Sequence, residues 1–372
     1  MIPARDQLFE GSASRVERVL LAQPRGFCAG VEMAIKALAW MVRVFEPPVY
    51  CYHEIVHNRL VVEEFRRQGV VFVDDVDEVP PLAPLMLSAH GSAPEVERAA
   101  ASKGRIVVDA CCPLVTKVHH ELKVRARKGY TILYVGHAGH EEAVGTMAVA
   151  PGAVRLLERE SDVDRLELDA SAPVALLAQT TLAHEEWEGI VDQARNRYPN
   201  LWMPGRSDLC YATTNRQTAV KALASRCDAM IVLGSANSSN TVALAKVAAS
   251  AGCPRVLRVN APSELPDDLA GVVGVTAGAS APEWLVVDLV ERLAPRAGIE
   301  VVHTTNEDEY FPPPPELRDL LRSLAVAAAL ALGAPTGSGP PTATDRQVTA
   351  TDMLIGDPTG KASERIAQPA PT

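Results

Sequence analysis

The sequence is poor in aromatic side chains, in positive charge and in long apolar runs. Aromatic residues make up 5% of the 372 positions, which leaves few rings for stacking on nucleic-acid bases. Acidic side chains outnumber basic ones and give a formal net charge of -10, whereas nucleic-acid-binding proteins usually present a basic face. The longest apolar run, 324–332, is far shorter than the roughly 18 residues that cross a bilayer. We therefore expect neither nucleic acid nor a membrane as a partner.

Signals of a secreted protein are also missing. No apolar secretion segment precedes residue 19, and the seven cysteines are an odd number without a C-x-x-C pair. An even set of cysteines behind a secretion signal would indicate a disulfide framework. Close cysteine pairs would be typical of structural zinc. These absences favour a soluble, cytoplasmic protein whose thiols stay reduced.

The sequence contains one pattern of residues that is repeated three times. Each copy begins at a cysteine: Cys28, Cys112 and Cys210. Gly136 lies 24 positions after Cys112, and Gly234 lies 24 positions after Cys210, each at the end of an apolar run. Copies of 84 and 98 residues (112 minus 28, 210 minus 112) have the size of whole βα subdomains. We therefore predict three equivalent subdomains that bring three thiols to one point.

Short β-branched runs alternate with amphipathic stretches, which indicates α/β subdomains with parallel sheets. We expect strands at 19–22, 70–73, 85–88, 106–109, 132–135, 174–178, 230–233 and 272–276, and helices at 31–44, 94–103, 115–128, 215–226, 241–251 and 282–293. Ligands of such sheets bind beyond the carboxyl ends of the strands. The polar loops of the three copies fall at these ends.

Three thiolates at one point suit a soft metal. A cubane iron-sulfur cluster needs four ligands, so three cysteines would leave one iron open to substrate. Structural zinc and merely buried thiols are the alternatives. Each of the three cysteines precedes an expected helix, whose N-terminus lowers a thiol pKa. The 24-position register selects Cys112 over the ambiguous Cys111, and the remaining cysteines lie within strand or helix sequence, as small buried hydrophobes do.

The polar loops provide hydrogen-bond donors next to helix starts, where phosphate groups bind. These donors are His57, His90, His140, Ser238, Ser239, Asn240 and Ser280. Taken singly, each is more often a helix cap or a core residue, but seven of them occupy equivalent places in three copies. No G-x-x-x-x-G-K-[ST] segment occurs, which argues against a nucleoside triphosphate.

Glu142 is the candidate proton donor of the loop that follows Gly136. In a closed apolar pocket the pKa of its carboxyl would rise, which suits it to deliver protons. Thr180 is a candidate for relaying the proton or orienting a substrate hydroxyl, although threonines at strand ends are more often structural. The adjacent Glu141 is expected to be solvated.

Nine ordered motifs carry a resemblance to a known family. They are QPRGFCAGV (23–31), HEIVHNR (53–59), SAHG (88–91), CPLVTKVH (112–119), GHAGHEE (136–142), QTT (179–181), CYATTNRQ (210–217), GSANSSN (234–240) and GVTAGASAP (274–282). Over residues 19–318 the chain closely resembles 4-hydroxy-3-methylbut-2-enyl diphosphate reductase, the last enzyme of the non-mevalonate isoprenoid pathway. Position 111 departs from the family, because it is Cys where the family usually has Thr.

The resemblance implies a cloverleaf of three αβα subdomains around one [4Fe-4S] cluster held by Cys28, Cys112 and Cys210, with one open iron. It implies that the diphosphate of the substrate is bound by His57, His90, His140, Ser238, Ser239, Asn240 and Ser280. Glu142, Thr180 and His140 are the catalytic residues that it implies, with Thr180 also contacting the substrate.

The resemblance also implies the reaction. Two electrons and two protons convert (E)-4-hydroxy-3-methylbut-2-enyl diphosphate into isopentenyl diphosphate or dimethylallyl diphosphate and water. No flavin or nicotinamide fingerprint is present, so we expect an external electron donor of the ferredoxin or flavodoxin type. Two other functions remain open, an iron-sulfur sensor of oxygen or iron and a zinc-stabilised phosphate-binding module.

The repeat and the resemblance together give the domain boundaries. We predict a flexible arm over 1–17, subdomains over 18–111, 112–209 and 210–318, and a low-complexity, largely disordered tail over 319–372. Residues 319–334 form a candidate Ala/Leu-rich helix at the start of that tail. Because the tail lies outside all three copies, we expect truncation after Arg318 to leave turnover largely intact.

Overall fold

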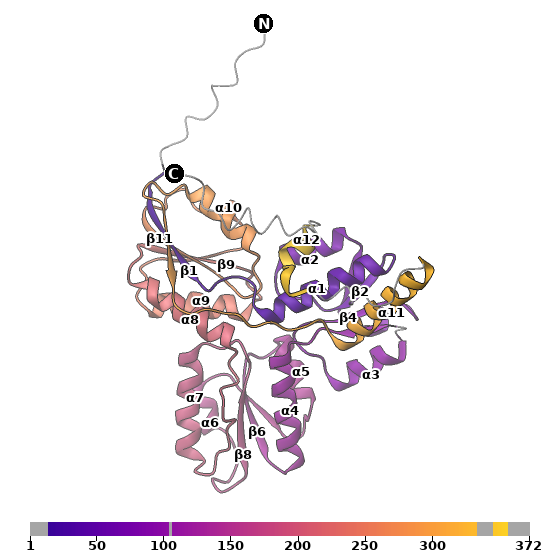
Figure 1. Cartoon of the computed structure of the whole chain (residues 1–372). Helices are drawn as coiled ribbons and strands as arrows, with labels where there is room; N and C mark the ends of the chain where they lie inside the picture. The colour runs from indigo at the N-terminus through magenta and orange to yellow at the C-terminus, as the bar shows by residue number, and fades with distance from the viewer. Residues whose placement is uncertain (1–13, 104–105, 333–344, 356–372) are drawn as a thin grey trace.

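The computed structural model describes residues 14–103, 106–332 and 345–355. Within them the strands form three parallel sheets, each covered by helices, and the three lobes meet at the centre of the molecule (Figure 1). Parallel strands need crossover connections, which the helices supply. The predicted α/β class with parallel sheets is confirmed.

The first lobe contains a four-stranded sheet in the order β3-β2-β4-β5. Its strands are β2 (Val49–Tyr52), β3 (Val70–Val73), β4 (Leu85–Leu87) and β5 (Val107–Asp109), and its helices are α1 (Ala29–Val44), α2 (Arg59–Arg67), the 3-10 turn η1 (Val76–Glu78) and α3 (Pro94–Lys103). Asn58 caps α2, because its side chain accepts hydrogen bonds from the amides of Leu60 and Val61. The cap fixes the start of the helix that follows His57.

The second lobe contains a three-stranded sheet in the order β7-β6-β8. Its strands are β6 (Thr131–Val135), β7 (Val154–Leu157) and β8 (Val174–Ala178), and its helices are α4 (Pro113–Arg127), α5 (Glu141–Ala148), α6 (Glu160–Asp164) and α7 (His184–Arg197). Strand β8 is buried at every position, as expected of a strand with both faces covered. Pro113 begins α4, where its missing amide proton costs no hydrogen bond.

The third lobe contains a five-stranded sheet in the order β10-β9-β11-β1-β12. Its strands are β1 (Val16–Gln23), β9 (Ala229–Leu233), β10 (Val256–Val259), β11 (Gly271–Ala277) and β12 (Ile299–His303), and its helices are α8 (Tyr211–Ala224), α9 (Ser239–Ser250), the 3-10 turn η2 (Pro262–Glu264) and α10 (Glu283–Leu293). Strand β1 pairs with β11 and β12. The grouping predicted over 18–111 therefore differs here, because β1 completes the core of the third lobe.

Every expected strand and helix is present, with bounds that differ from the predicted ones by at most four residues. Sequence reasoning missed the interior strand β2, short strands at the sheet edges (β7, β10 and β12) and several helices, including α2, α5 and α7. Edge strands carry exposed polar positions; β12 alternates between exposed and half-buried residues. Such strands lack the continuous apolar run that identifies a central parallel strand.

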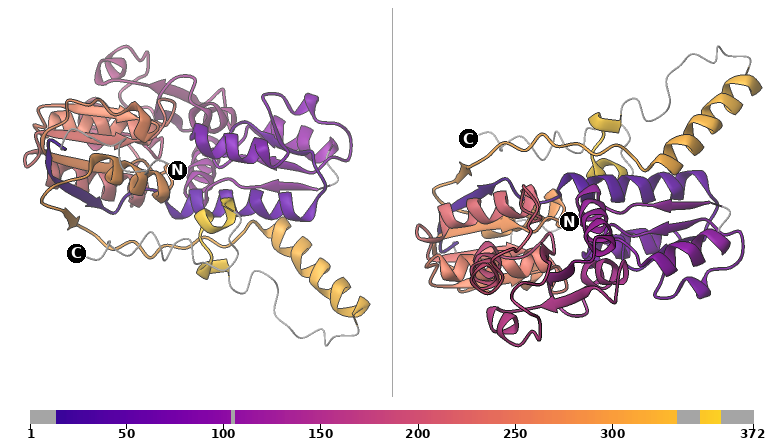
Figure 2. Two further views of the ribbon diagram at one scale, coloured as in Figure 1. Left: turned by 90° about the horizontal axis from the view of Figure 1, so that it is seen from above. Right: turned by 90° about the horizontal axis from the view of Figure 1, so that it is seen from below.

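The C-terminal part of the chain differs from the predicted tail. Helix α11 (Pro315–Ala331) packs Leu317 and Leu321 into the core of the first lobe, and its far end projects from the body of the molecule (Figure 2). Helix α12 (Ala350–Leu354) is buried against α1. The rest of the predicted tail, and most of the arm predicted over 1–17, lie outside the described residues.

Among the described residues, no helix combines the length and the apolar character that a bilayer crossing requires.

Candidate active site

Three thiols meet in one central cavity. Cys28, Cys112 and Cys210 are the N-caps of α1, α4 and α8, one helix from each lobe. All three line the same cavity of about 100 Å³. The equivalent positions in the three copies therefore converge in space, as the repeat predicted.

Gly30 lets two of these thiols approach each other. A Cβ atom at this position would lie 2.6 Å from Sγ of Cys112 and 3.9 Å from Sγ of Cys28. Real Cβ atoms essentially never come closer than 3.0 Å to a heavy atom. The first turn of α1 therefore needs glycine here, so that the sulfur from the second lobe fits against it.

Burial has the largest effect on the pKa values of the three thiols. It raises the pKa of Cys112 well above the ordinary value and raises the pKa of Cys210 to about 11. The pKa of Cys28 is also raised by burial, which the positive charge of Arg216 only partly offsets. The amides at the three helix starts lower these pKa values, as expected, but desolvation of the thiolates raises them by more.

Cys111 does not share the cavity with its neighbour. Its Sγ lies 3.4 Å from Oγ1 of Thr116, and a Cβ atom at Gly91 would come within 3.2 Å of that sulfur. Burial raises the pKa of Cys111 to about 12, so the thiol is protonated at neutral pH. The structure places Cys112, and not Cys111, at the centre, in agreement with the 24-position register.

Three histidines from two lobes form one wall of the cavity. The rings of His57 and His90 stack with centroids 3.9 Å apart, and the ring of His140 stands edge-on to His57 at 5.1 Å. Burial lowers the pKa of His140 to about 3. Its Nδ1 accepts a hydrogen bond from the amide of Glu142 at 3.1 Å, which leaves Nε2 to carry the proton. Nε2 of His57 is buried without a partner, so it is free for a ligand.

Glu141, which we expected to be solvated, contacts this wall. Its Oε2 lies 2.7 Å from Nδ1 of His90, and its Oε1 lies 3.7 Å from Nδ1 of His53. Burial alone would raise its pKa, but the contact with His90 and the nearby imidazoles lower it to about 2. His57, His90 and Glu141 offer ligand atoms within 4.8 Å of one another, a spacing that a metal ion also accepts. The contact between Glu141 and His90 joins the second lobe to the first. The spacing of residues within either sequence motif therefore does not predict it.

The third lobe supplies the serine and asparagine donors. Ser238 caps α9 through Oγ, and Ser239 Oγ receives a hydrogen bond from the Gln179 amide group at 3.2 Å. The side-chain oxygen of Asn240 accepts from the amide of Ala279 at 2.9 Å, and Ser280 Oγ donates to the carbonyl of His57 at 2.9 Å. These contacts fix the loops, and all four residues line the central cavity.

Glu142 is buried, with 3% of its surface exposed, and borders the same cavity. Its carboxylate accepts hydrogen bonds from the amide of Thr180 at 2.7 Å and from the Thr180 hydroxyl at 3.0 Å. Burial raises the pKa of Glu142 to about 7, although the two hydrogen bonds from Thr180 lower it. A carboxyl with this pKa can hold or release a proton near neutral pH.

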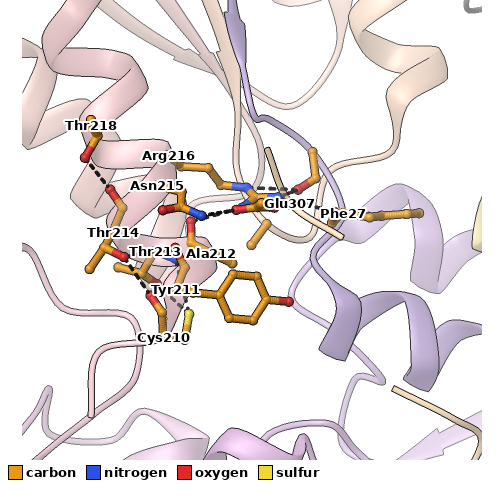
Figure 3. Close-up of polar contacts among 12 residues, drawn as sticks. Phe27, Cys210, Tyr211, Ala212, Thr213, Thr214, Asn215, Arg216, Thr218 and Glu307 are labelled. Carbon is orange, nitrogen blue, oxygen red and sulfur yellow. Dashed lines mark hydrogen bonds and ion pairs between the residues drawn. The ribbon is translucent and has the colours of Figure 1, made fainter. Parts of the chain in front are cut away.

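Sequence reasoning missed a buried arginine that joins two of the cysteine loops. Arg216 lies on α8 with a fully buried side chain and pairs with Glu307 at 3.0 Å (Figure 3). Its guanidinium also donates to the carbonyls of Gly26, at 2.8 Å, and Phe27. The loop before Cys28 is thereby held against the helix that Cys210 caps. The partners are 91 to 190 positions apart, so no local pattern reveals them.

All the site residues predicted from the sequence are therefore together. The three cysteines, three histidines, Glu142 and Thr180, and the four donors of the third lobe, line a single cavity. The set combines three sulfur ligands, neutral hydrogen-bond donors and one carboxyl of raised pKa. It can bind a soft metal centre and an anion side by side and can move a proton between them.

Comparisons with known proteins agree with this arrangement. A family model described as LytB protein matches residues 19–294. Curated 4-hydroxy-3-methylbut-2-enyl diphosphate reductases are similar: that of Rhodopirellula baltica is 46% identical over 83% of this chain and 98% of its own length, and that of Nocardia farcinica is 47% identical over 83% and 94%.

Two solved structures are also similar. The E-1-hydroxy-2-methyl-but-2-enyl-4-diphosphate reductase from Plasmodium falciparum aligns with a TM-score of 0.81 at 31% identity, over 83% of this chain and 99% of that chain. A second solved structure is of (E)-4-hydroxy-3-methyl-but-2-enyl diphosphate reductase, described as the terminal enzyme of the non-mevalonate pathway. It aligns with a TM-score of 0.55 at 29% identity, over 75% and 99%.

Proposed function

Because this chain belongs to the LytB family of 4-hydroxy-3-methylbut-2-enyl diphosphate reductases, we propose that its central cavity holds an iron-sulfur cluster and the substrate together. The chain reduces (E)-4-hydroxy-3-methylbut-2-enyl diphosphate to isopentenyl and dimethylallyl diphosphate, with loss of water, as the last step of the non-mevalonate pathway. The observation that carries the proposal is the meeting of three thiols and Glu142 in one cavity.

The cofactor that we propose is one [4Fe-4S] cluster on Cys28, Cys112 and Cys210. Three sulfur ligands, one from each lobe, suit a cubane with one iron left open. The glycine at position 30 supports this, because it makes room for the Cys112 sulfur beside Cys28. When bound, such a cluster supplies a Lewis-acid iron and electrons one at a time.

The histidine wall and the third lobe bind the diphosphate of the substrate in this proposal. Nε2 of His57 has no hydrogen-bond partner among the described residues. Nε2 of His140 carries a proton and can donate it in a hydrogen bond to a phosphate oxygen. Ser238, Ser239, Asn240 and Ser280 complete the set around the cavity. Burial disfavours charged imidazoles, but a phosphate anion beside them favours their protonation. Glu141 supports His90 in the same way, through its negative charge.

Glu142 is the proton donor in our proposal. Hydroxide is a poor leaving group, so a proton must reach the oxygen atom that departs. A carboxyl whose pKa is near 7 is partly protonated at neutral pH, and the Thr180 hydroxyl adjoins it at 3.0 Å. Thr180 orients the substrate hydroxyl or relays the proton, while His140 fixes the backbone at Glu142.

Electrons come from an external donor of the ferredoxin or flavodoxin type. We infer this from the absence of flavin and nicotinamide fingerprints in the sequence. We also propose a cytoplasmic location, because the seven cysteines are free thiols, as expected in a reducing compartment.

Anaerobic turnover tests the proposal. The protein is purified without oxygen and given the hydroxylated diphosphate with a chemical reductant, while iron, sulfide and zinc are measured. We expect a brown protein with about four irons per chain that releases both products. A colourless zinc protein would favour the phosphate-binding alternative, which the spacing of His57, His90 and Glu141 permits. A cluster without turnover would favour a sensor.

A further inference from the structure

Two aromatic residues separate the central cavity from a larger one. The second cavity has a volume of about 520 Å³ and opens along the outer side of α1. In the part of the chain that the structure describes, only Tyr211 and Phe311 line both cavities. Tyr211 follows the cysteine that caps α8, whereas Phe311 comes from a segment far along the chain. Between them these residues form the wall that the two cavities share.

Phe311 lies on a segment without helix or strand, 304–314, which joins β12 to α11. We call this segment the strap. A wall built on irregular backbone keeps its place only through anchors. One anchor is the ion pair between Glu307 and the fully buried Arg216 (Figure 3). A second is Tyr310, whose hydroxyl donates to Oδ2 of Asp345 at 3.0 Å. A third, more exposed contact joins Asp308 to Arg346 at 2.8 Å.

Asp345 links the strap to α1, the helix that Cys28 caps. Nζ of Lys36, on α1, donates to Oδ2 of Asp345 at 2.7 Å, to its carbonyl at 2.8 Å and to the carbonyl of Val348 at 3.2 Å. The side chains of the pair are only 4% and 2% exposed. The ammonium group thus has three acceptors, all from the C-terminal segment. Removal of one buried charge would leave the other without compensation.

The C-terminal segment is attached at further points. The carboxylate of Glu32 accepts a hydrogen bond from the amide of Ala350, and the Arg43 guanidinium donates to the carbonyl of Met353 at 2.9 Å. Glu32 and Arg43 lie about three turns apart on α1. Residues 345–355 also lie beyond the part of the chain that the family model matches, 19–294. Family membership therefore does not account for this attachment.

We propose that Asp345 is a positioning residue that holds Phe311 beside Tyr211 and so keeps water and dioxygen from the thiol centre. Through Tyr310 it fixes the strap one residue before Phe311, and through Lys36 it fixes the strap to α1. The protective role rests on the proposed function, since it requires a cluster in the central cavity. The positioning of Phe311 by Asp345 does not depend on a cluster.

The test uses the full-length protein, purified anaerobically with its cluster. Asp345→Ala removes the anchor, and Asp345→Asn is a milder second variant in case the first does not fold. Glu309→Ala is the matched control, because it removes an exposed acidic side chain of the same strap, whereas Asp308 itself contacts Arg346 of the C-terminal segment. Phe311→Ala opens the wall but keeps the anchor. Hydrogen exchange of residues 304–311 and the decay of visible absorbance in air are measured for each.

We expect exchange in the strap to become about tenfold faster in Asp345→Ala, with faster loss of absorbance, while exchange in β6 stays unchanged. Phe311→Ala should speed the loss of absorbance without speeding exchange at 345–355, and Glu309→Ala should change neither. Unchanged strap exchange in both Asp345 variants would overturn the proposal, as would normal air stability in Phe311→Ala. A protein that never holds a cluster would refute the proposed function, and the exchange data alone would then decide whether Asp345 positions the strap.

Discussion

Thr180 contacts both carboxylate oxygens of Glu142, the amide at 2.7 Å and the hydroxyl at 3.0 Å. The amide donor is part of the backbone after β8, so the second lobe itself fixes the orientation of the carboxyl. Both hydrogen bonds favour the ionised form, but burial disfavours it more strongly, and the pKa rises to about 7. The acid is therefore held in place and partly protonated near neutral pH.

Glu142→Gln should lower turnover by about 10²-fold or more, the usual scale for a positioned acid. The amide keeps the size of the side chain but cannot release the proton. Iron content and the affinity for the diphosphate should be retained, which equilibrium binding of the substrate would check. His57→Ala or Ser280→Ala should show the opposite pattern, with weaker binding of the diphosphate. Near-normal turnover in Glu142→Gln with an intact cluster would mean that another group supplies the proton.

The pH dependence follows from the same carboxyl. If protonated Glu142 is the donor, turnover should fall as the pH rises through about 7. Thr180→Val removes the hydroxyl and keeps the amide, so the charged form loses one hydrogen bond and the pKa rises further. The falling limb of the pH profile should then move to higher pH. If the falling limb stays at the same pH in Thr180→Val, or moves to lower pH, the fall in turnover is not caused by ionisation of Glu142.

Stability should depend on pH through Glu142 as well. Its pKa is raised from 4.5 to about 7 on folding, so the folded protein binds this proton more tightly than the unfolded chain. The resulting stabilisation is complete below about 4.5 and is lost as the pH rises through about 7. Denaturation with urea at several pH values should show this loss in the natural protein, and Glu142→Gln should reduce it.

Cys112→Ser should abolish the stable cluster, and Cys111→Ser should retain it. Cys112 lines the central cavity, whereas Cys111 does not. Cys28→Ser and Cys210→Ser should behave like Cys112→Ser, because each removes one of three sulfur ligands. Iron and sulfide analysis with visible spectra measures this. Loss of the cluster in Cys111→Ser together with a normal cluster in Cys112→Ser would refute the 24-position spacing that selected Cys112.

Gly30→Ala should reduce cluster content strongly, because its Cβ atom would lie 2.6 Å from Sγ of Cys112. Movement of that sulfur distorts the ligand set. Gly152→Ala is the control, since a Cβ atom there meets nothing within 4 Å. Iron bound per chain after anaerobic reconstitution should separate the two variants. Equal iron content in Gly30→Ala and Gly152→Ala would show that α4 can move away from position 30 without loss of the cluster.

Removal of residues 345–372 should destabilise the protein by about 2–5 kcal/mol, the usual scale for losing buried apolar side chains, because Met353 and Leu354 belong to the core of the first lobe. Lys36 would lose all three of its acceptors. The control is removal of 356–372, which retains these contacts. Truncation after Arg318 would remove the same contacts, which is a structural reason against our expectation that it leaves turnover largely intact. Equal urea midpoints for the two truncated proteins would remove that reason.

The sequence by itself determined the class of the fold and the members of the site. Each cysteine stands before a helix, and each donor loop follows an apolar strand, so spacing within a copy is enough to identify them. Cys112 was distinguished from Cys111 by register alone. Most central strands were recognised for the same reason, since strands covered on both faces are apolar without interruption. The interior strand β2 was missed, because its two tyrosines are only half-buried.

Tertiary structure decided which groups meet across the lobes and how they titrate. Glu141 contacts His90 from another lobe, Arg216 reaches Glu307 over 91 positions, and Lys36 reaches Asp345 over 309. No periodicity links such residues, because they are neighbours only after the lobes have packed. The thiol pKa values were misjudged for a related reason. A helix N-terminus is visible in the sequence, but the burial that outweighs it is a property of the assembled core.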